Sequence, residues 1–304
     1  MKKFILKFLL ISLIVSLLIS GLIFLSEFIV KKMEGQSLKL SEDKYYVFSG
    51  NSAVQCSVDD GLIKHSVNIA QSGEAYLYSY SKLKALLNAN DHIKTVFISF
   101  SYGDLLIEKE LSWLFSNEFV VEKIQHYNYL LDLPEKTLLL KNNPQAYFLG
   151  LTKSIYKNAI LVLSNFSTGS PAGKLVNFGG YKYLVRDKLE ADPGNYVNQK
   201  ADFEKSSLQE KYLKMISDLC RQHSVTLVLF NPPKYKSYNK NLDMGIWNLW
   251  FEVRNSLPGD SLLDLSGYVL PDSCYGDLSH LNYKGARIFS QYLNEQLNPP
   301  VIAE

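Results

Sequence analysis

The hydrophobic and polar positions divide the chain into an unbroken apolar segment near the N-terminus and a mixed remainder. Residues 8–26 are 19 consecutive positions without a charged side chain, and most of them are Leu, Ile, Val or Phe. A helix of that length would measure roughly 28 Å, close to the thickness of the apolar part of a bilayer. No other stretch is long enough to span, so the pattern predicts a single transmembrane helix.

Two other interpretations of this segment stay open, a buried core helix and a cleavable signal peptide. Three lysines before the apolar run fit a signal peptide, but the run is longer than a typical signal core and no A-x-A site follows it. We expect an uncleaved anchor over residues 1–32, a polar tether over residues 33–44 and one domain over residues 45–304.

Beyond the tether, strand-like runs alternate with helix-like segments. Strands are expected at residues 45–49, 67–70, 94–100 and 225–230, and helices from after the first strand to about residue 65, then at 75–88, 203–222 and 282–296. The last two strands are almost continuously apolar, which indicates burial on both faces. The alternation predicts an α/β fold, a three-layer sandwich around a parallel sheet, with the ligand site beyond the carboxyl ends of the strands. Residues 104–200 are less regular and are expected to form an irregular or lid-like insertion.

Composition and charge exclude several classes of protein. With 47% hydrophobic and 20% charged residues, wholesale disorder is excluded. The net charge of +2 divides into +4 within residues 1–32 and −2 in the remainder, so we expect no nucleic-acid partner. The small excess of lysine before the span predicts a domain outside the cytoplasm, on the periplasmic or extracytoplasmic side of an inner or cytoplasmic membrane. Three cysteines without a CxxC or HExxH motif suggest neither metal nor cofactor.

Two candidates for chemistry follow the first two strands. Ser52, in YYVFSGNS, comes after a strand and is placed to open a helix, where a hydroxyl and a free backbone N–H would face the site. Gly73, in NIAQSG, could bring its N–H close to a ligand. Taken alone, Ser52 is more often a helix cap and Gly73 an ordinary turn glycine.

A third candidate is the DLSHLNYKGA segment near the C-terminus. Asp277 and His280 lie three residues apart just before a helix, so a carboxylate can meet Nδ1 and leave Nε2 for a nucleophile. The alternative is a surface histidine beside a capping aspartate. Asn231, directly after the 225–230 strand, could also reach the site, although a turn before Pro232 explains it as well.

These motifs together resemble the SGNH (GDSL-type) hydrolase superfamily over about residues 45–295. The chain looks most like membrane-anchored bacterial members that modify cell-surface polymers, such as those involved in D-alanylation of teichoic acids or acetylation of exopolysaccharides. The resemblance implies that Ser52 is the nucleophile, His280 its base and Asp277 the residue that orients the base. The oxyanion hole would contain the amides of Ser52 and Gly73.

The chain also departs from the family pattern. Asn51 replaces the usual Asp of the first block, and Ser101, Tyr102, Gly103 and Asp104 replace the GxND block that normally supplies an oxyanion-hole Asn. Two functions therefore stay open. One is a serine esterase or O-acyltransferase acting on an acylated envelope glycan or polymer, with a membrane-embedded acyltransferase as a candidate partner. The other is a catalytically impaired member that serves as an anchored binding or assembly factor.

Overall fold

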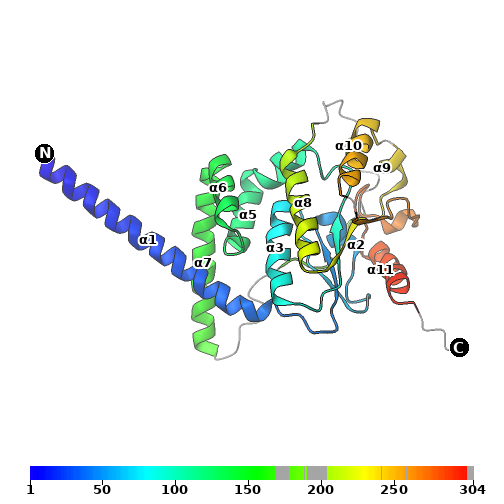
Figure 1. Ribbon diagram of the computed structural model, residues 1–304, viewed down its shortest axis with the longest axis horizontal. Coiled ribbons are helices and arrows are strands. Elements are labelled where there is room, and N and C mark those ends of the chain that lie inside the picture. Colours follow the sequence, from blue (N-terminus) through cyan, green and yellow to red (C-terminus); the bar gives the residue numbers. More distant parts are fainter. Residues whose placement is uncertain (169–177, 188, 190–203, 241, 258, 300–304) are drawn as a thin grey trace.

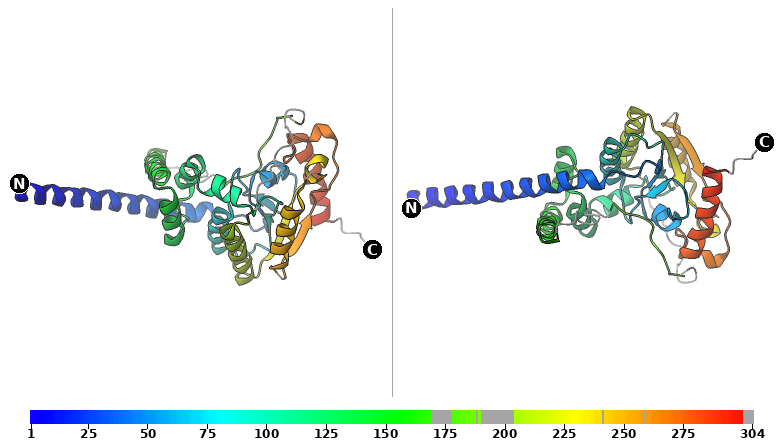
Figure 2. Two further views of the ribbon diagram at one scale, coloured as in Figure 1. Left: turned by 90° about the horizontal axis from the view of Figure 1, so that it is seen from above. Right: turned by 90° about the horizontal axis from the view of Figure 1, so that it is seen from below.

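The computed structural model describes residues 1–168, 178–187, 189, 204–240, 242–257 and 259–299. The first helix, α1 (Lys2–Ser37), is unbroken and extends through the first part of the expected tether. Its segment Lys3–Lys32 is long and apolar enough to cross a membrane, and an 18-residue window within it has a mean hydropathy of 2.9. Most of it projects away from the rest of the molecule (Figures 1 and 2).

The base of α1 is tied to the domain by a carboxylate. Glu27 pairs with Lys136 Nζ at 2.6 Å and accepts a hydrogen bond from Asn128 Nδ2. Val30 and Leu38, further along, are buried in the core of the domain. The last turns of the helix are therefore part of the folded domain.

The sheet has five parallel strands in the order β2-β1-β3-β4-β5. They are β1 (Tyr46–Ser49), β2 (Ser66–Asn68), β3 (Thr95–Ser99), β4 (Thr226–Asn231) and β5 (Ser261–Asp264). This order has a topological switch point between β1 and β3, where doubly wound sheets bind ligands. The predicted α/β class and parallel sheet are confirmed, whereas β5 was not predicted. Its side chains are mostly exposed, so it lacks the apolar run that marks a buried strand.

Helices cover both faces of the sheet (Figure 1). One face packs under α3 (Tyr76–Ala89), α8 (Ser207–Gln222) and α10 (Met244–Asn255). The other packs under α2 (Ser52–Ser57) and α11 (Tyr283–Leu297), where the phenylalanines of three strands and of α11 stack against one another. Two short helices, α9 (Lys236–Lys240) and the 3-10 turn η2 (Asp272–Cys274), lie in the connections.

The segment expected to be irregular is mostly helical where the structure describes it. It contains α4 (Ile107–Lys109), a π-helical turn (Glu110–Leu114), α5 (Asn117–Tyr127), α6 (Leu133–Asn142) and α7 (Pro144–Thr168). These helices form a layer beside the sheet, with α7 packed against both α5 and α1. They were missed because most are short and their apolar faces are interrupted by polar residues. Conversely, α2 ends at Ser57 and does not continue to residue 65.

Close packing at the switch point requires a glycine. Gly50 has a φ of +119°, and a Cβ atom there would lie 2.3 Å from the Cβ atom of Ser99 on β3. We expect Gly50→Ala to lower the free energy of unfolding by about 2 kcal/mol or more, since it combines backbone strain with overpacking. Urea unfolding of the full chain in detergent measures the change. Gly267→Ala is the control, because no atom lies within 4 Å of the added Cβ, and an equal loss in both variants would contradict the argument.

Candidate active site

The turn after β1 presents Ser52 at the first position of α2. Asn51, and not Ser52, is the N-cap: its side-chain oxygen accepts the Ala53 N–H at 2.9 Å. The interpretation of Ser52 as a mere cap is therefore wrong, and its hydroxyl is available for another contact. That contact is with His280, whose Nε2 lies 2.8 Å from Ser52 Oγ.

His280 is in turn held by Asp277. Its Nδ1 lies 2.8 Å from Asp277 Oδ1 and 3.0 Å from Oδ2. With Nδ1 donating to the carboxylate, Nε2 is left to accept the proton of Ser52. The structure thus brings together the three residues expected to form a triad, in the relation of nucleophile, base and orienting carboxylate.

The loop that carries Asp277 and His280 is fixed by Asn282. The Asn282 side-chain oxygen caps α11 by accepting from the amides of Lys284 and Gly285. Its Nδ2 donates to the carbonyls of Ser273 at 2.8 Å and Tyr275 at 3.2 Å. One side chain therefore joins the start of the helix to the turn on the other side of His280.

Asp277 has two further partners. Ser279 donates to Oδ1 through its amide at 2.9 Å and through its hydroxyl at 3.1 Å. Arg186 forms an ion pair with Oδ2. The carboxylate that contacts His280 is thus surrounded by two donors of Ser279 and by the guanidinium of Arg186. Arg186 was not predicted, because it lies 91 positions before Asp277 in a segment with no motif of its own.

Arg186 belongs to an extended strap, residues 178–187, that runs past the site. Two backbone hydrogen bonds hold the strap. Gly180 N–H donates to the Ala70 carbonyl at 3.0 Å, and Lys182 N–H donates to the Gln55 carbonyl at 2.9 Å. Gly179 allows this close approach, because a Cβ atom there would lie 2.2 Å from the Ala70 oxygen.

The loop after β2, which contains Gly73, is hydrogen-bonded to the turn after β1 that carries Ser52 and to α2. Gln71 N–H donates to the Gly50 carbonyl at 2.9 Å, and Ser72 Oγ donates to Gln55 Oε1 of α2 at 2.8 Å. Gly73 itself has a φ of +59°. Within the described residues, the amides of Ser52 and Gly73 donate to no protein acceptor. Neither amide is therefore used by a hydrogen bond of the described fold.

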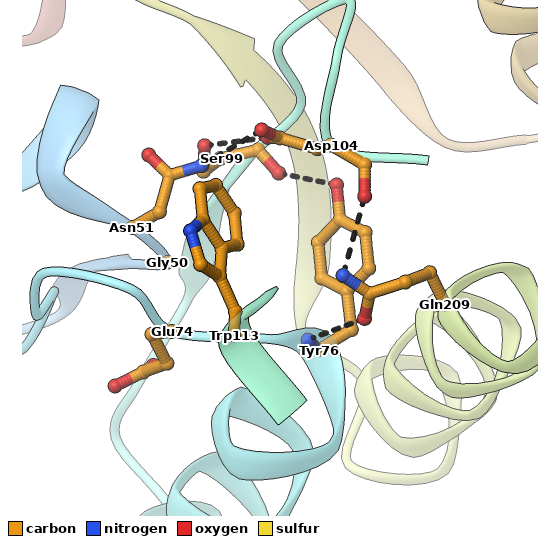
Figure 3. A pocket seen from close by; sticks show the side chains of 8 residues that line it. All are labelled: Gly50, Asn51, Glu74, Tyr76, Ser99, Asp104, Trp113 and Gln209. Atoms are coloured by element: carbon orange, nitrogen blue, oxygen red, sulfur yellow. Dashed lines mark hydrogen bonds between the residues drawn. The ribbon is translucent and has the colours of Figure 1, made fainter. Parts of the chain in front are cut away.

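An asparagine at residue 51 fits its surroundings, because its side-chain amide faces the buried carboxylate of Asp104. Asp104 Oδ1 accepts from Asn51 Nδ2 at 2.9 Å, and Oδ2 accepts from Ser99 Oγ at 3.0 Å and from the Ser101 amide at 2.9 Å. Burial raises the pKa of Asp104 from its usual value. Asn51, Ser99 and Asp104 line a narrow pocket, too small to hold a water molecule, that reaches Glu74 and Trp113 (Figure 3). Ser52 and His280 do not line this pocket.

Ser101, Tyr102 and Asn231 lie near the position where the family resemblance predicts an oxyanion-hole Asn, and their surroundings differ. Tyr102 OH contacts Asp264 at 3.1 Å and Ser266 at 3.2 Å, so it is directed toward β5. Among the described residues, Ser101 Oγ and both polar atoms of the Asn231 side chain are buried and have no hydrogen-bond partner. No hydrogen bond therefore joins Asn231 to Ser52, His280 or Asp277 within that part of the chain. Its part in an oxyanion hole stays a prediction.

A buried lysine, Lys234, contacts the loop that carries Asp277 and His280. Lys234 Nζ donates to the Ser279 carbonyl at 3.1 Å, and its residue exposure is 3%. Burial lowers its pKa from 10.5 to about 8, partly offset by the charges of Asp104, Cys56 and Asp264. The protonated amine is therefore costly to keep inside the folded protein at neutral pH.

A comparison with family models gives one match, to an uncharacterised family, over residues 194–301. This is less than half of the chain, and it includes Asp277 and His280 but not Ser52. A comparison with curated proteins finds no match. The function of the protein therefore has to be inferred from the geometry of the site.

The hydrogen bond between Asn51 and Asp104 predicts the effect of placing an aspartate at residue 51. In Asn51→Asp, two buried carboxylates would lie about 3 Å apart and could not both ionise, so the pKa of the pair would rise. We expect the variant to lose roughly 1–3 kcal/mol of stability at pH 7.5 and less at pH 5, where the pair holds a proton. Thermal unfolding at the two pH values measures this. The exchange variant Asn51→Asp/Asp104→Asn should recover most of the loss, and equal stability at both pH values would contradict the explanation.

Lys234 predicts a second pH dependence of opposite sign. Its pKa is lower in the folded state, about 8, than the ordinary value of 10.5, so the unfolded chain binds more protons between these values. Stability should therefore rise with pH from about 8 to 9.5, by on the order of 1 kcal/mol for this residue. Urea unfolding at pH 7.5 and 9.5 measures the rise. Lys234→Met should lack it, and an identical rise in both proteins would show that other groups cause it.

Proposed function

We propose that the protein is an SGNH-type serine esterase or O-acyltransferase. The observation that supports this most directly is the 2.8 Å contact between Ser52 Oγ and His280 Nε2, with Asp277 on the other ring nitrogen. Serine is a poor nucleophile at its free pKa and needs an adjacent base, and that base needs a group that fixes its tautomer. The parallel sheet and the position of Ser52 after β1 agree with the resemblance in the sequence.

The arrangement supports acyl transfer in two steps. Ser52 Oγ attacks the carbonyl carbon of an ester while His280 Nε2 takes its proton. The tetrahedral intermediate collapses, the C–O bond to the leaving alcohol breaks, and His280 returns the proton to that alcohol. The acyl-serine is then attacked by water or by a sugar hydroxyl, with His280 again accepting and returning one proton. Asp277 stabilises the imidazolium in both steps.

The amides of Ser52 and Gly73 are the proposed donors to the oxyanion. Ser52 N–H lies at the N-terminus of α2, and Gly73 N–H lies in the loop hydrogen-bonded to the same turn. Donors of this kind lower the barrier because the negative charge develops only in the transition state. Asn231 is a candidate third donor, since its buried side-chain amide has no partner.

The proposed substrate is an acyl ester on a glycan or other polymer of the cell envelope. With α1 as a membrane anchor and the domain outside the cytoplasm, the site would face the cell surface. His280 is about one-fifth exposed, which suits a bulky substrate approaching from solvent. A membrane-embedded acyltransferase that hands over the acyl group is the proposed partner.

A catalytically impaired member of the same family is the second candidate. It is favoured by one observation: the side chains of Ser101 and Tyr102, which stand where the family has its oxyanion-hole block, form no hydrogen bond with Ser52 or His280 within the described residues. Loss of one such donor typically lowers the rate by about 10²–10³-fold. An anchored binding or assembly factor would tolerate that loss.

The experiment that tests the first candidate is labelling of the full chain in detergent with a fluorophosphonate probe. We expect the wild type to be labelled and to hydrolyse a short acyl ester, and Ser52→Ala to do neither. Ser207→Ala, an exposed serine on α8, is the control and should behave as the wild type. Full labelling of Ser52→Ala would overturn the assignment of the nucleophile, and an inert wild type that still binds polysaccharide would favour the second candidate.

A further inference from the structure

We propose that Lys123 on α5 is a positioning residue that orients the Gly73 amide toward the oxyanion. The inference rests on the proposed function, because it assumes that the Gly73 N–H acts as an oxyanion donor. It concerns a residue outside the triad and outside every motif considered above. Lys123 reaches the site through the loop at residues 69–74, which we call the β2–α3 loop.

The geometry of one peptide unit carries the argument. Lys123 Nζ donates to the Ser72 carbonyl at 3.0 Å. In a planar trans peptide the C=O and the N–H of the next residue point in opposite directions. The bond to Lys123 therefore directs the Gly73 N–H away from α5. That amide has no protein acceptor within the described residues, as expected of a donor kept for a ligand.

The lysine is well placed for this because its side chain is fully buried and bonded within the same loop. Its Nζ also donates to Gln71 Oε1 at 2.9 Å and lies 3.7 Å from Glu122. Burial lowers the pKa of Lys123, offset in part by Glu74 and Glu122. Burying an ammonium group costs desolvation free energy. The hydrogen bonds of Lys123 Nζ go to acceptors of the β2–α3 loop, Gln71 Oε1 and the Ser72 carbonyl, as expected of a residue that positions this loop.

A second residue of α5 supports the same peptide. A Cβ atom added to Gly73 would lie 2.0 Å from a ring carbon of Phe119, one helical turn before Lys123. Phe119 thus limits residue 73 to glycine, and the φ of +59° lets the chain pass the ring. Helix α5 holds the loop from one side while Gln71 N–H binds the Gly50 carbonyl on the other.

The first test compares Lys123→Met with Lys123→Arg in the full chain in detergent. Met keeps the apolar stem but donates no hydrogen bond, so we expect kcat on p-nitrophenyl acetate to fall about 10- to 100-fold, with KM within about twofold. Arg keeps a donor and should restore most of kcat. Tyr127→Phe is the control: it removes another donor to Gln71 Oε1 but leaves the bond to the Ser72 carbonyl, and should change kcat by less than about twofold.

The second test measures hydrogen exchange in the wild type, so it does not depend on the folding of a variant. Phosphonylation of Ser52 in the wild type places an oxygen where the oxyanion would form. We expect deuterium uptake at the Gly73 amide to slow at least about tenfold in this adduct.

The outcomes separate the two proposals. A wild type that the probe does not label overturns the proposed function and the premise of this inference. A labelled wild type with unchanged uptake at Gly73 overturns Gly73 as an oxyanion donor, and with it the role of Lys123, but leaves the assignment of Ser52, His280 and Asp277 intact. A folded Lys123→Met variant with wild-type kcat overturns the role of Lys123 alone.

Discussion

The contact between α2 and α11 on one face of the sheet is the constraint on which the site geometry depends. Ser52 opens one of these helices and His280 precedes the other, so two residues 228 positions apart meet only when both helices pack together. Gly285 lets the start of α11 lie close to η2, the turn before Asp277 and His280, since a Cβ atom there would lie 2.2 Å from the Cys274 carbonyl oxygen. The phenylalanine stack beneath both helices provides the buried apolar surface that stabilises the arrangement.

Much of the fold could be predicted because its central strands are buried on both faces. β1, β3 and β4 are short apolar runs followed by Gly50, by a polar turn and by Asn231-Pro232, which are strong local signals. β5 is an edge strand with exposed side chains and gives no such signal. The helical layer of α5–α7 was missed because its burial depends on neighbours distant in the sequence. Periodicity within a short helix does not report such contacts.

The same distinction explains which parts of the site were predicted. Asp277 and His280 are three residues apart, so their pairing is a local property that a motif records. Asn51 looked like a defect until the structure paired it with Asp104, 53 positions away. Arg186 and Lys123 act through contacts with Asp277 and Ser72 that bridge unrelated segments. A single sequence carries no mark of such contacts, since isolated basic residues are usually solvated.

The ion pair between Glu27 and Lys136 has a consequence for how the molecule is handled. Cutting the chain after residue 32 to obtain a soluble fragment would remove the partner of Lys136 and Asn128, which lie at the start of α6 and just beyond the end of α5. It would also remove Val30 from the apolar core. The fragment would therefore differ from the intact protein in the helical layer that contacts the β2–α3 loop. Activity lost on removing the anchor would then reflect a disturbed loop as much as a missing membrane.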